Sequence, residues 1–230
     1  MRKNRTAHHL HWAGVAMNRR NYAARGKCVL RILLCTMLAL PMLSCTTTRR
    51  PTLLTLPASS ASGSPQIHTE AEGRRIVAVG RLELPEYMVT RRVRYRDDAS
   101  TLAEWPNTYW AERIEISTAR EFHAALRAAL PAWQLCEERC SNQTLSLSLR
   151  LRVDRLDYVR SERRLHATVD IALWSAGTAP RLLRNTVHQY DIAGDTDTAQ
   201  AQARAMSELL RDVAADTAQS ISLTDLGGPT

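Results

Sequence analysis

The first 44 residues contain no acidic side chain, and the rest of the chain contains no lysine. Residues 1–44 hold eight of the 31 basic residues, so residues 45–230 hold the other 23 together with all 23 acidic residues. This later part is therefore neutral, although the whole chain carries a net charge of +8. The net positive charge comes from residues 1–44 and therefore gives no argument for nucleic-acid binding.

The chain also lacks a long apolar run near its start. The apolar stretch 32–43 is shorter than the about 20 residues that a membrane-spanning helix needs. A basic segment, a short apolar run and Ser44 before Cys45 are typical of a secretory signal peptide over residues 1–44. Met42-Leu43-Ser44-Cys45 fits the lipobox of bacterial lipoproteins, in which the cysteine is lipidated and begins the mature protein. Ordinary secretion is the alternative, and Met17 is an alternative start to Met1.

Motifs for catalysis and metal binding are missing as well. Residues 45–230 contain no G-x-S-x-G, P-loop or Rossmann glycine pattern. Their four histidines are scattered, without an HExxH or other paired spacing, at His68, His123, His166 and His188. We therefore expect that the protein is not an enzyme and that it has no catalytic residue, bound metal or cofactor. A periplasmic hydrolase with a dispersed Ser/His/Asp site is the alternative.

Cysteine is scarce after the signal segment, where only Cys45, Cys136 and Cys140 occur. If Cys45 carries lipid, the other two form an even pair in an oxidising compartment, where a disulfide is the default. Closing so short a loop removes little entropy from the unfolded chain, which corresponds to a stabilisation of ~2 kcal/mol. We expect a local disulfide. Free thiols or a metal site are the alternatives, and two sulfurs without a neighbouring histidine disfavour zinc.

Apolar and polar residues alternate most regularly over 145–154, as in an antiparallel strand with one buried face. A turn at 161–163 leads to a partner strand over 165–173, and 182–190 forms the third strand of the meander. Three shorter strands are predicted upstream, at 53–56, 76–84 and 89–96.

Two helices are predicted, over 117–130 and about 198–221. Thr118 and Glu121 are spaced as a capping box at the start of the first helix. Asp195 and Asp197 precede the second helix, where negative charge suits the helix dipole. The apolar residues of both segments recur at helical spacing and define one buried stripe each.

The order of these elements predicts a single α+β domain, with an antiparallel sheet of about six strands covered by two helices. We divide the chain into a lipoprotein signal peptide (1–44), a lipid tether (45–51), a folded domain (52–224) and a tail (225–230).

Arginine and aromatic residues are concentrated between residues 84 and 112. Both are enriched at protein–protein interfaces, and they also form cation–π contacts. A core aromatic cluster beside a solvated arginine face is an equal alternative. The residues of the predicted protein interface are Leu84, Pro85, Tyr87, Arg92, Trp110 and Glu112.

Several motifs, taken in order, carry a resemblance to a known family. They are Cys45, Leu53–Leu56, Val77–Gly80, Leu84-Pro85-Glu86-Tyr87-Met88, Arg91–Arg96, Tyr109-Trp110-Ala111-Glu112, Leu130–Trp133, the strand 144–154 with Asp154 and Tyr158, and the last helix. With them the chain resembles the PqiC-type auxiliary lipoproteins of MCE transport systems over essentially all of 45–223. It departs from the family pattern at 89–92, at Arg113 and in having Cys136 and Cys140.

The resemblance implies a non-enzymatic subunit of a lipid-transport and membrane-integrity system. Such lipoproteins form homo-oligomeric rings at the periplasmic face of the outer membrane and receive an MCE tunnel, which works with a permease and an ATPase. Thr46 follows the lipidated cysteine in place of the aspartate that retains lipoproteins in the inner membrane, which favours the outer membrane. The alternative function is an assembly or pilot lipoprotein for an outer-membrane β-barrel or secretin.

Overall fold

A computed structural model describes residues 50–58, 75–137, 140 and 143–225. The predicted signal peptide, Cys45, most of the tether and the tail after residue 225 lie outside the described residues. The described elements, in chain order, are β1 (Thr52–Leu54), β2 (Arg75–Glu83), the 3-10 helix η2 (Glu86–Met88), β3 (Arg92–Arg96), β4 (Leu102–Trp110), α2 (Ile114–Ala129), β5 (Trp133–Cys136), β6 (Leu147–Val159), β7 (Arg164–Ser175), β8 (Leu182–Ala193) and α3 (Ala199–Asp225).

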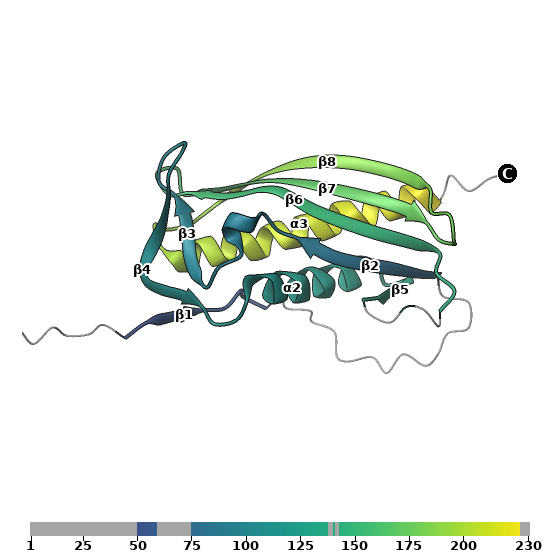
Figure 1. Cartoon of the computed structure of the whole chain (residues 1–230), viewed down its shortest axis with the longest axis horizontal. Helices are drawn as coiled ribbons and strands as arrows, with labels where there is room; N and C mark the ends of the chain where they lie inside the picture. The colour runs from purple at the N-terminus through teal and green to yellow at the C-terminus, as the bar shows by residue number, and fades with distance from the viewer. Residues whose placement is uncertain (1–49, 59–74, 138–139, 141–142, 226–230) are drawn as a thin grey trace, which may run out of the picture. The chain divides into compact units, whose positions relative to one another are not determined.

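The predicted three-strand meander is confirmed as β6, β7 and β8, which run antiparallel and side by side in Figure 1. Alternate residues of β6 and β7 point to one face and are fully buried, among them Leu149, Leu165, Val169 and Leu173. Polar residues of the same strands point to the other face. The period-two pattern of the sequence therefore identified both the strands and their buried side.

The remaining strands make the sheet larger and more mixed than the sequence predicted. The described residues form one eight-stranded sheet, in which β2 runs parallel to β6 and also to the short edge strand β5. Strand β3 pairs antiparallel with β4, and β1 adds to β4 in parallel. No separate strand was predicted at β4 or β5, so the expected number of about six strands was too low, while the α+β fold class is confirmed.

The first helix begins earlier than predicted. Helix α2 starts at Ile114, because this fully buried residue extends the stripe of Phe122 and Leu126 about two turns upstream. Thr118 is consequently inside the helix, where its hydroxyl donates to the Ile114 carbonyl at 2.8 Å. The predicted capping box of Thr118 and Glu121 was therefore wrong.

The second helix starts close to the predicted position, but its cap differs. The Thr198 hydroxyl accepts the amide hydrogen of Ala201 at 3.2 Å and so caps α3. Asp195 and Asp197 instead form ion pairs with Arg204 at 2.6 Å and Arg160 at 2.9 Å. These aspartates fasten the loop before α3 to neighbouring elements.

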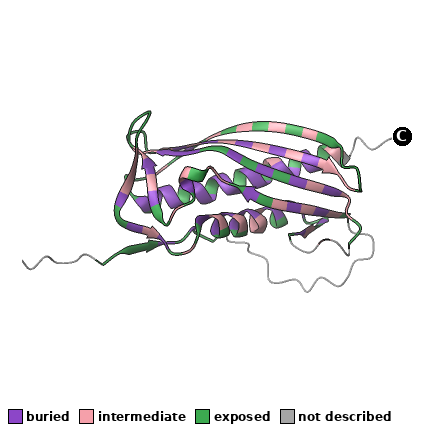
Figure 2. Ribbon diagram, in the orientation of Figure 1, coloured by how far each residue is buried: buried purple, intermediate pink, exposed green. Residues whose placement is uncertain are grey.

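Both helices cover the apolar face of the sheet. Side chains of α2 and α3 meet those of β2, β6 and β7 in one layer. A common apolar gap in this layer is lined by Thr118, Met206, Leu82, Val153 and Val169. In Figure 2, buried residues line the side of α3 along the sheet, whereas β8 alternates between half-buried and exposed residues. Within the described ranges, no helix is long and apolar enough to cross a bilayer.

Candidate functional site

The segment Leu84–Met88, predicted as part of a protein interface, leaves the end of β2 and turns at Pro85 into η2. Met88 is buried in the core, while Leu84 and Tyr87 pack against that core and remain half-exposed. Arg94 of β3 donates to the Tyr87 carbonyl at 3.1 Å. The turn is therefore held from two sides, with part of its surface open to solvent.

Tyr87 fills a break in the pairing of β6. Strand β2 pairs with β6 as far as Arg152, and β3 meets the same edge only at Val159. Between these points the Leu156 amide donates to the Tyr87 hydroxyl at 3.0 Å. A side chain thus replaces a missing strand at this edge, since a buried amide needs an acceptor. Burial raises the pKa of Tyr87, so the phenol is protonated near neutral pH.

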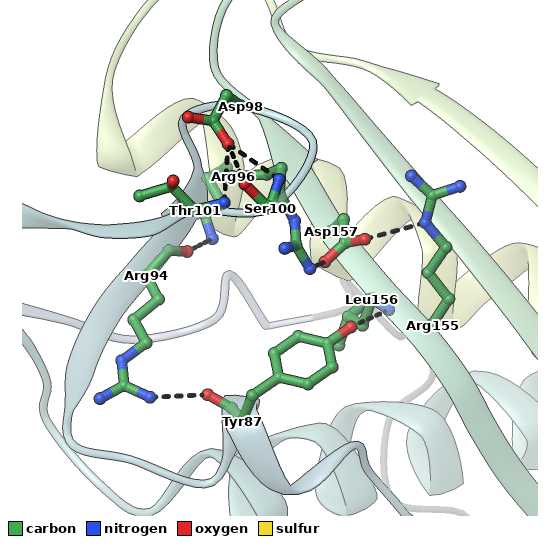
Figure 3. A network of polar contacts seen from close by, with 10 residues as sticks. Tyr87, Arg94, Arg96, Asp98, Ser100, Thr101, Arg155, Leu156 and Asp157 are labelled. Carbon is green, nitrogen blue, oxygen red and sulfur yellow. Dashed lines mark hydrogen bonds and ion pairs between the residues drawn. The ribbon is translucent and has the colours of Figure 1, made fainter.

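An arginine–carboxylate network lies next to Tyr87 (Figure 3). Asp157 is 6% exposed and accepts from Arg96 and from Arg155, each at 2.8 Å. Burial alone raises the pKa of Asp157, but the hydrogen bonds from the two guanidinium groups bring it below the ordinary value. The Arg96 guanidinium also lies 5.8 Å from the centre of the Tyr87 ring. The carboxylate is ionised and fully engaged, which suits a structural role.

The hairpin between β3 and β4 extends beyond this network. Asp98 accepts the amide hydrogens of Ser100 and Thr101, both at 2.8 Å, and these backbone hydrogen bonds lower its pKa. A cleft of about 510 Å³ lies between this hairpin and the β6–β7 turn. Its lining residues are Arg96, Asp97, Asp98, Ala99, Arg155, Asp157, Val159, Ser161 and Glu162. Most of these residues are charged, and Arg96 and Arg155 among them are already paired with Asp157.

Arg92, Trp110 and Glu112, the other predicted interface residues, lie apart from this network. Trp110 is only 1% exposed and belongs to the core, so it offers no contact surface. Arg92 is half-exposed, pairs with Glu104 at 3.2 Å, and stacks 5.2 Å from the Tyr109 ring. Glu112 pairs with Arg120 of α2 at 2.7 Å. The structure therefore leaves Arg92 and Glu112 available at the surface.

A second arginine cluster was missed from the sequence. Arg160 follows β6, and its guanidinium lies over the rings of Tyr95 at 5.0 Å and Trp105 at 4.6 Å. It also pairs with Asp197 before α3. Behind it, Trp105 donates to Gln202 at 2.7 Å, and Gln202 donates to the Arg94 carbonyl at 2.7 Å. These contacts join β3, β4 and α3, which are far apart in the sequence.

The cysteine pair lies at the edge of the sheet. A disulfide joins Cys136, the last residue of β5, to Cys140. Free thiols or a metal site, the two alternatives considered from the sequence, would leave the two sulfurs without a bond between them.

The described histidines are each next to a carboxylate. His123 contacts Glu137 at 2.9 Å, His166 contacts Glu162 at 2.9 Å, and His188 contacts Asp216 at 3.2 Å. Burial lowers the pKa of His123. Across the described ranges, no group of three or more His, Cys, Asp or Glu side chains is arranged to hold a metal ion.

Comparisons with known proteins place this geometry in a family. A crystal structure of an uncharacterized protein superposes with a TM-score of 0.60 and 15% sequence identity, covering 75% of this chain and 99% of that one. Protein XCC0632 from Xanthomonas campestris gives a TM-score of 0.55 at 14% identity, covering 76% of this chain and 97% of that one. No curated protein matches the chain in sequence. These structures show a shared fold, and the family model of the ABC-type transport auxiliary lipoprotein component matches residues 54–218, so the chain belongs to that family.

Proposed function

We propose that this protein is a non-enzymatic lipoprotein subunit of an MCE-type lipid-transport system, and that it docks the MCE tunnel at the periplasmic face of the outer membrane. The family match over residues 54–218 carries the proposal, because it spans nearly the whole described domain. It makes the chain an auxiliary component of a transporter. The proposal adds that the transporter is an MCE system and that the membrane is the outer membrane.

The sequence before the domain supports an anchored location. Met42-Leu43-Ser44-Cys45 ends an apolar run, and Thr46 follows the cysteine. A lipidated Cys45 attaches the domain to a membrane through a short tether, without a membrane-spanning helix. With Thr46 in place of aspartate, sorting to the outer membrane follows where that rule operates.

The arrangement of paired charges supports a binding role over catalysis. The Asp157 carboxylate is held by Arg96 and Arg155, and Tyr87 accepts a backbone amide. Groups engaged in this way stabilise a surface and are poorly placed to transfer protons. Their positions keep the Leu84–Tyr87 turn in a fixed shape, as a docking surface requires.

An open sheet edge supports the homo-oligomeric part of the proposal. Strand β8 pairs with β7 alone within the described sheet, so its other edge is unpaired. Leu182, Leu183 and Val187 on this strand are 50%, 42% and 61% exposed. Unpaired edges with exposed apolar side chains are sites where another chain adds. We assign this edge to contacts between subunits.

The test is recovery of partners from the cell envelope. The full-length tagged lipoprotein is expressed in its own host, extracted in mild detergent, and its partners are identified by mass spectrometry. We expect an MCE-domain protein with its permease and ATPase. Recovery of a β-barrel or a secretin without an MCE protein would overturn the proposal in favour of an assembly factor.

Surface variants make the same experiment specific. Arg92→Glu combined with Glu112→Arg reverses two exposed charges of the predicted interface, and we expect it to lower recovery of the MCE protein. Arg152→Glu combined with Asp154→Arg swaps two exposed, paired charges on β6, outside the predicted interface, and is the matched control. Equal recovery from all forms would exclude this surface as the contact.

A further inference from the structure

Exposed apolar side chains are gathered where the chain enters the domain. Leu53 of β1 is 59% exposed, Ile116 near the start of α2 is 53% exposed, and Val89 after η2 is 43% exposed. The other four large apolar residues that are exposed within the described ranges are on β8 and at the end of α3, at Leu182, Leu183, Val187 and Leu223. Leu53, Val89 and Ile116 therefore form a separate group, which we name the β1 surface together with Arg91 and Tyr109.

Backbone pairing places two members of the β1 surface, Leu53 and Tyr109, beside Arg92. Leu53 is the register partner of Tyr109, and Tyr109 is the register partner of Arg92. Register partners on neighbouring strands point to the same side of the sheet, so the three side chains form a row. The Arg92 guanidinium lies over the Tyr109 ring and fixes its orientation.

Two hydrogen bonds attach the neighbouring segments to this row. The Ala111 amide donates to the Leu54 carbonyl at 2.7 Å, which joins β1 to the chain that starts α2 and carries Ile116. The Trp110 amide donates to the Arg91 carbonyl at 2.7 Å, which holds the Val89–Arg91 segment beside β4. The segments that carry Val89 and Ile116 are thus attached to the backbone of β4 and of β1.

The length of the tether decides what this surface meets. Arg50, the first described residue, is five residues after Cys45, a reach of at most about 18 Å even when fully extended. If Cys45 carries lipid, β1 remains next to the bilayer. The exposed apolar residues at the end of α3 and on β8 are remote from the bilayer. Ser207 contacts Pro57 just after β1, and α3 continues from Ser207 to Leu223, about 24 Å further on at 1.5 Å per residue. The start of β8 lies at that far end, where Arg184 contacts Thr224.

We propose that the β1 surface binds the phospholipid bilayer directly, with Leu53, Val89 and Ile116 at the level of the acyl-chain boundary and Arg91 at the phosphates. The proposal rests on lipidation of Cys45. Arginine binds phosphate through two parallel hydrogen bonds, and a tyrosine ring suits the membrane–water interface, where one end is apolar and the other is hydrated. The domain is then oriented on the membrane and does not swing freely on its tether.

Position-specific fluorescence tests this orientation. The lipidated protein is purified with Leu53→Cys or Ile116→Cys, labelled with an environment-sensitive fluorophore, and reconstituted in phosphatidylethanolamine–phosphatidylglycerol vesicles. Acyl chains carrying a spin label quench a fluorophore at the bilayer. We expect quenching at positions 53 and 116 to exceed that of Ala128→Cys several-fold, because Ala128 is exposed near the far end of α2, about 18 Å from Ile116 at 1.5 Å per residue.

A charge variant tests whether the label itself causes the quenching at position 53. Arg91→Glu is added to Leu53→Cys, and repulsion from anionic phosphates should reduce quenching at position 53 to near the level of position 128. Equal quenching at positions 53, 116 and 128 in protein that floats with the vesicles would overturn the proposed surface. Protein that does not float with the vesicles would show instead that the lipid anchor is absent, and both proposals would fail.

Discussion

The Tyr87 hydroxyl accepts the amide hydrogen of Leu156 at 3.0 Å, across a separation of 69 residues. This single contact connects the turn after β2 to the middle of β6, where no strand pairs with that edge in the described sheet. The leucine–proline–x–tyrosine turn therefore has a structural task in this fold. Its proline directs the chain away from β6, and its tyrosine satisfies the amide left behind.

Removing the Tyr87 hydroxyl should destabilise the domain. Tyr87→Phe keeps the ring but leaves the Leu156 amide without its acceptor, which we expect to lower the free energy of unfolding by about 1–3 kcal/mol. Urea denaturation of the mature protein, followed by tryptophan fluorescence, measures the change. Tyr109→Phe is the matched control, since it keeps its ring under Arg92. A loss no greater than that of the control would contradict this assignment.

Replacing Asp157 should destabilise the domain and reduce its sensitivity to acid. Asp157→Asn leaves Arg96 without its carboxylate, and we expect a loss of about 2–4 kcal/mol at neutral pH. The pKa of Asp157 is lowered on folding, so the folded state binds fewer protons and the stabilisation is complete above the unfolded value of about 3.9. It disappears as pH falls through the folded pKa.

Denaturation midpoints between pH 7 and pH 3 check this sign. The difference between wild type and Asp157→Asn should shrink as the solution becomes acidic. Asp154→Asn is the control, because this exposed residue lies in the same strand and pairs with Arg152 at the surface. A difference that stays constant down to pH 3 would show that the charge of Asp157 is not what stabilises the fold.

How much of the fold the sequence predicts depends on where its local pattern is regular. Strand β7 and the first part of β6 alternate strictly, so Leu149, Leu151, Val169 and Leu173 were assigned to the buried side correctly. Strand β4 was not recognised, because Pro106 and Asn107 interrupt its pattern and Asn107 has a positive φ of 49°. Its strand character arises from pairing with β1 and β3, which no local window contains.

The exposure of the predicted interface residues was anticipated less evenly than the fold. Arginine and aromatic composition identified the region of Tyr87 and Arg92, but composition does not distinguish a half-exposed tyrosine from the buried Trp110. Arg160 and Gln202 were missed, because their partners Tyr95, Asp197 and Trp105 are brought together only by tertiary packing. The only local signal for Arg160 was its position directly before the predicted turn between β6 and β7.

Loss of the disulfide should have a small effect. Cys136→Ser with Cys140→Ser opens a loop of only a few residues, for which the entropic model gives about 2 kcal/mol or less. The variant should remain folded and membrane-bound, with a modest fall in its urea midpoint. Wild type treated with a thiol reductant is the control and should behave like the variant. Unfolding of the variant at ambient temperature would contradict this expectation.

Removing the proposed lipid site should release the protein from membranes. Cys45→Ala leaves the chain without an acyl anchor, and we expect it in the soluble fraction of the envelope after fractionation. Ser44→Ala is the matched control, because it keeps a small residue before the cysteine. Continued sedimentation of Cys45→Ala with membranes would sink the lipidation assignment, unless the uncleaved signal segment is found still attached by mass spectrometry.

A lysine in the open edge of β8 should block self-association while preserving the fold. Val187 is 61% exposed, and its register partner on β7 is Asp170, so the new ammonium has a carboxylate opposite it within the subunit. A second strand adding at this edge would have to bury that charge, which natural edge strands use to prevent pairing. We therefore expect Val187→Lys to be monomeric in native mass spectrometry under conditions where the wild type is a closed oligomer. Ala128→Lys, on the exposed side of α2, adds the same charge and should leave the oligomer intact. An unchanged oligomer in Val187→Lys would exclude this edge and direct the search for the subunit contact to Arg92 and Glu112.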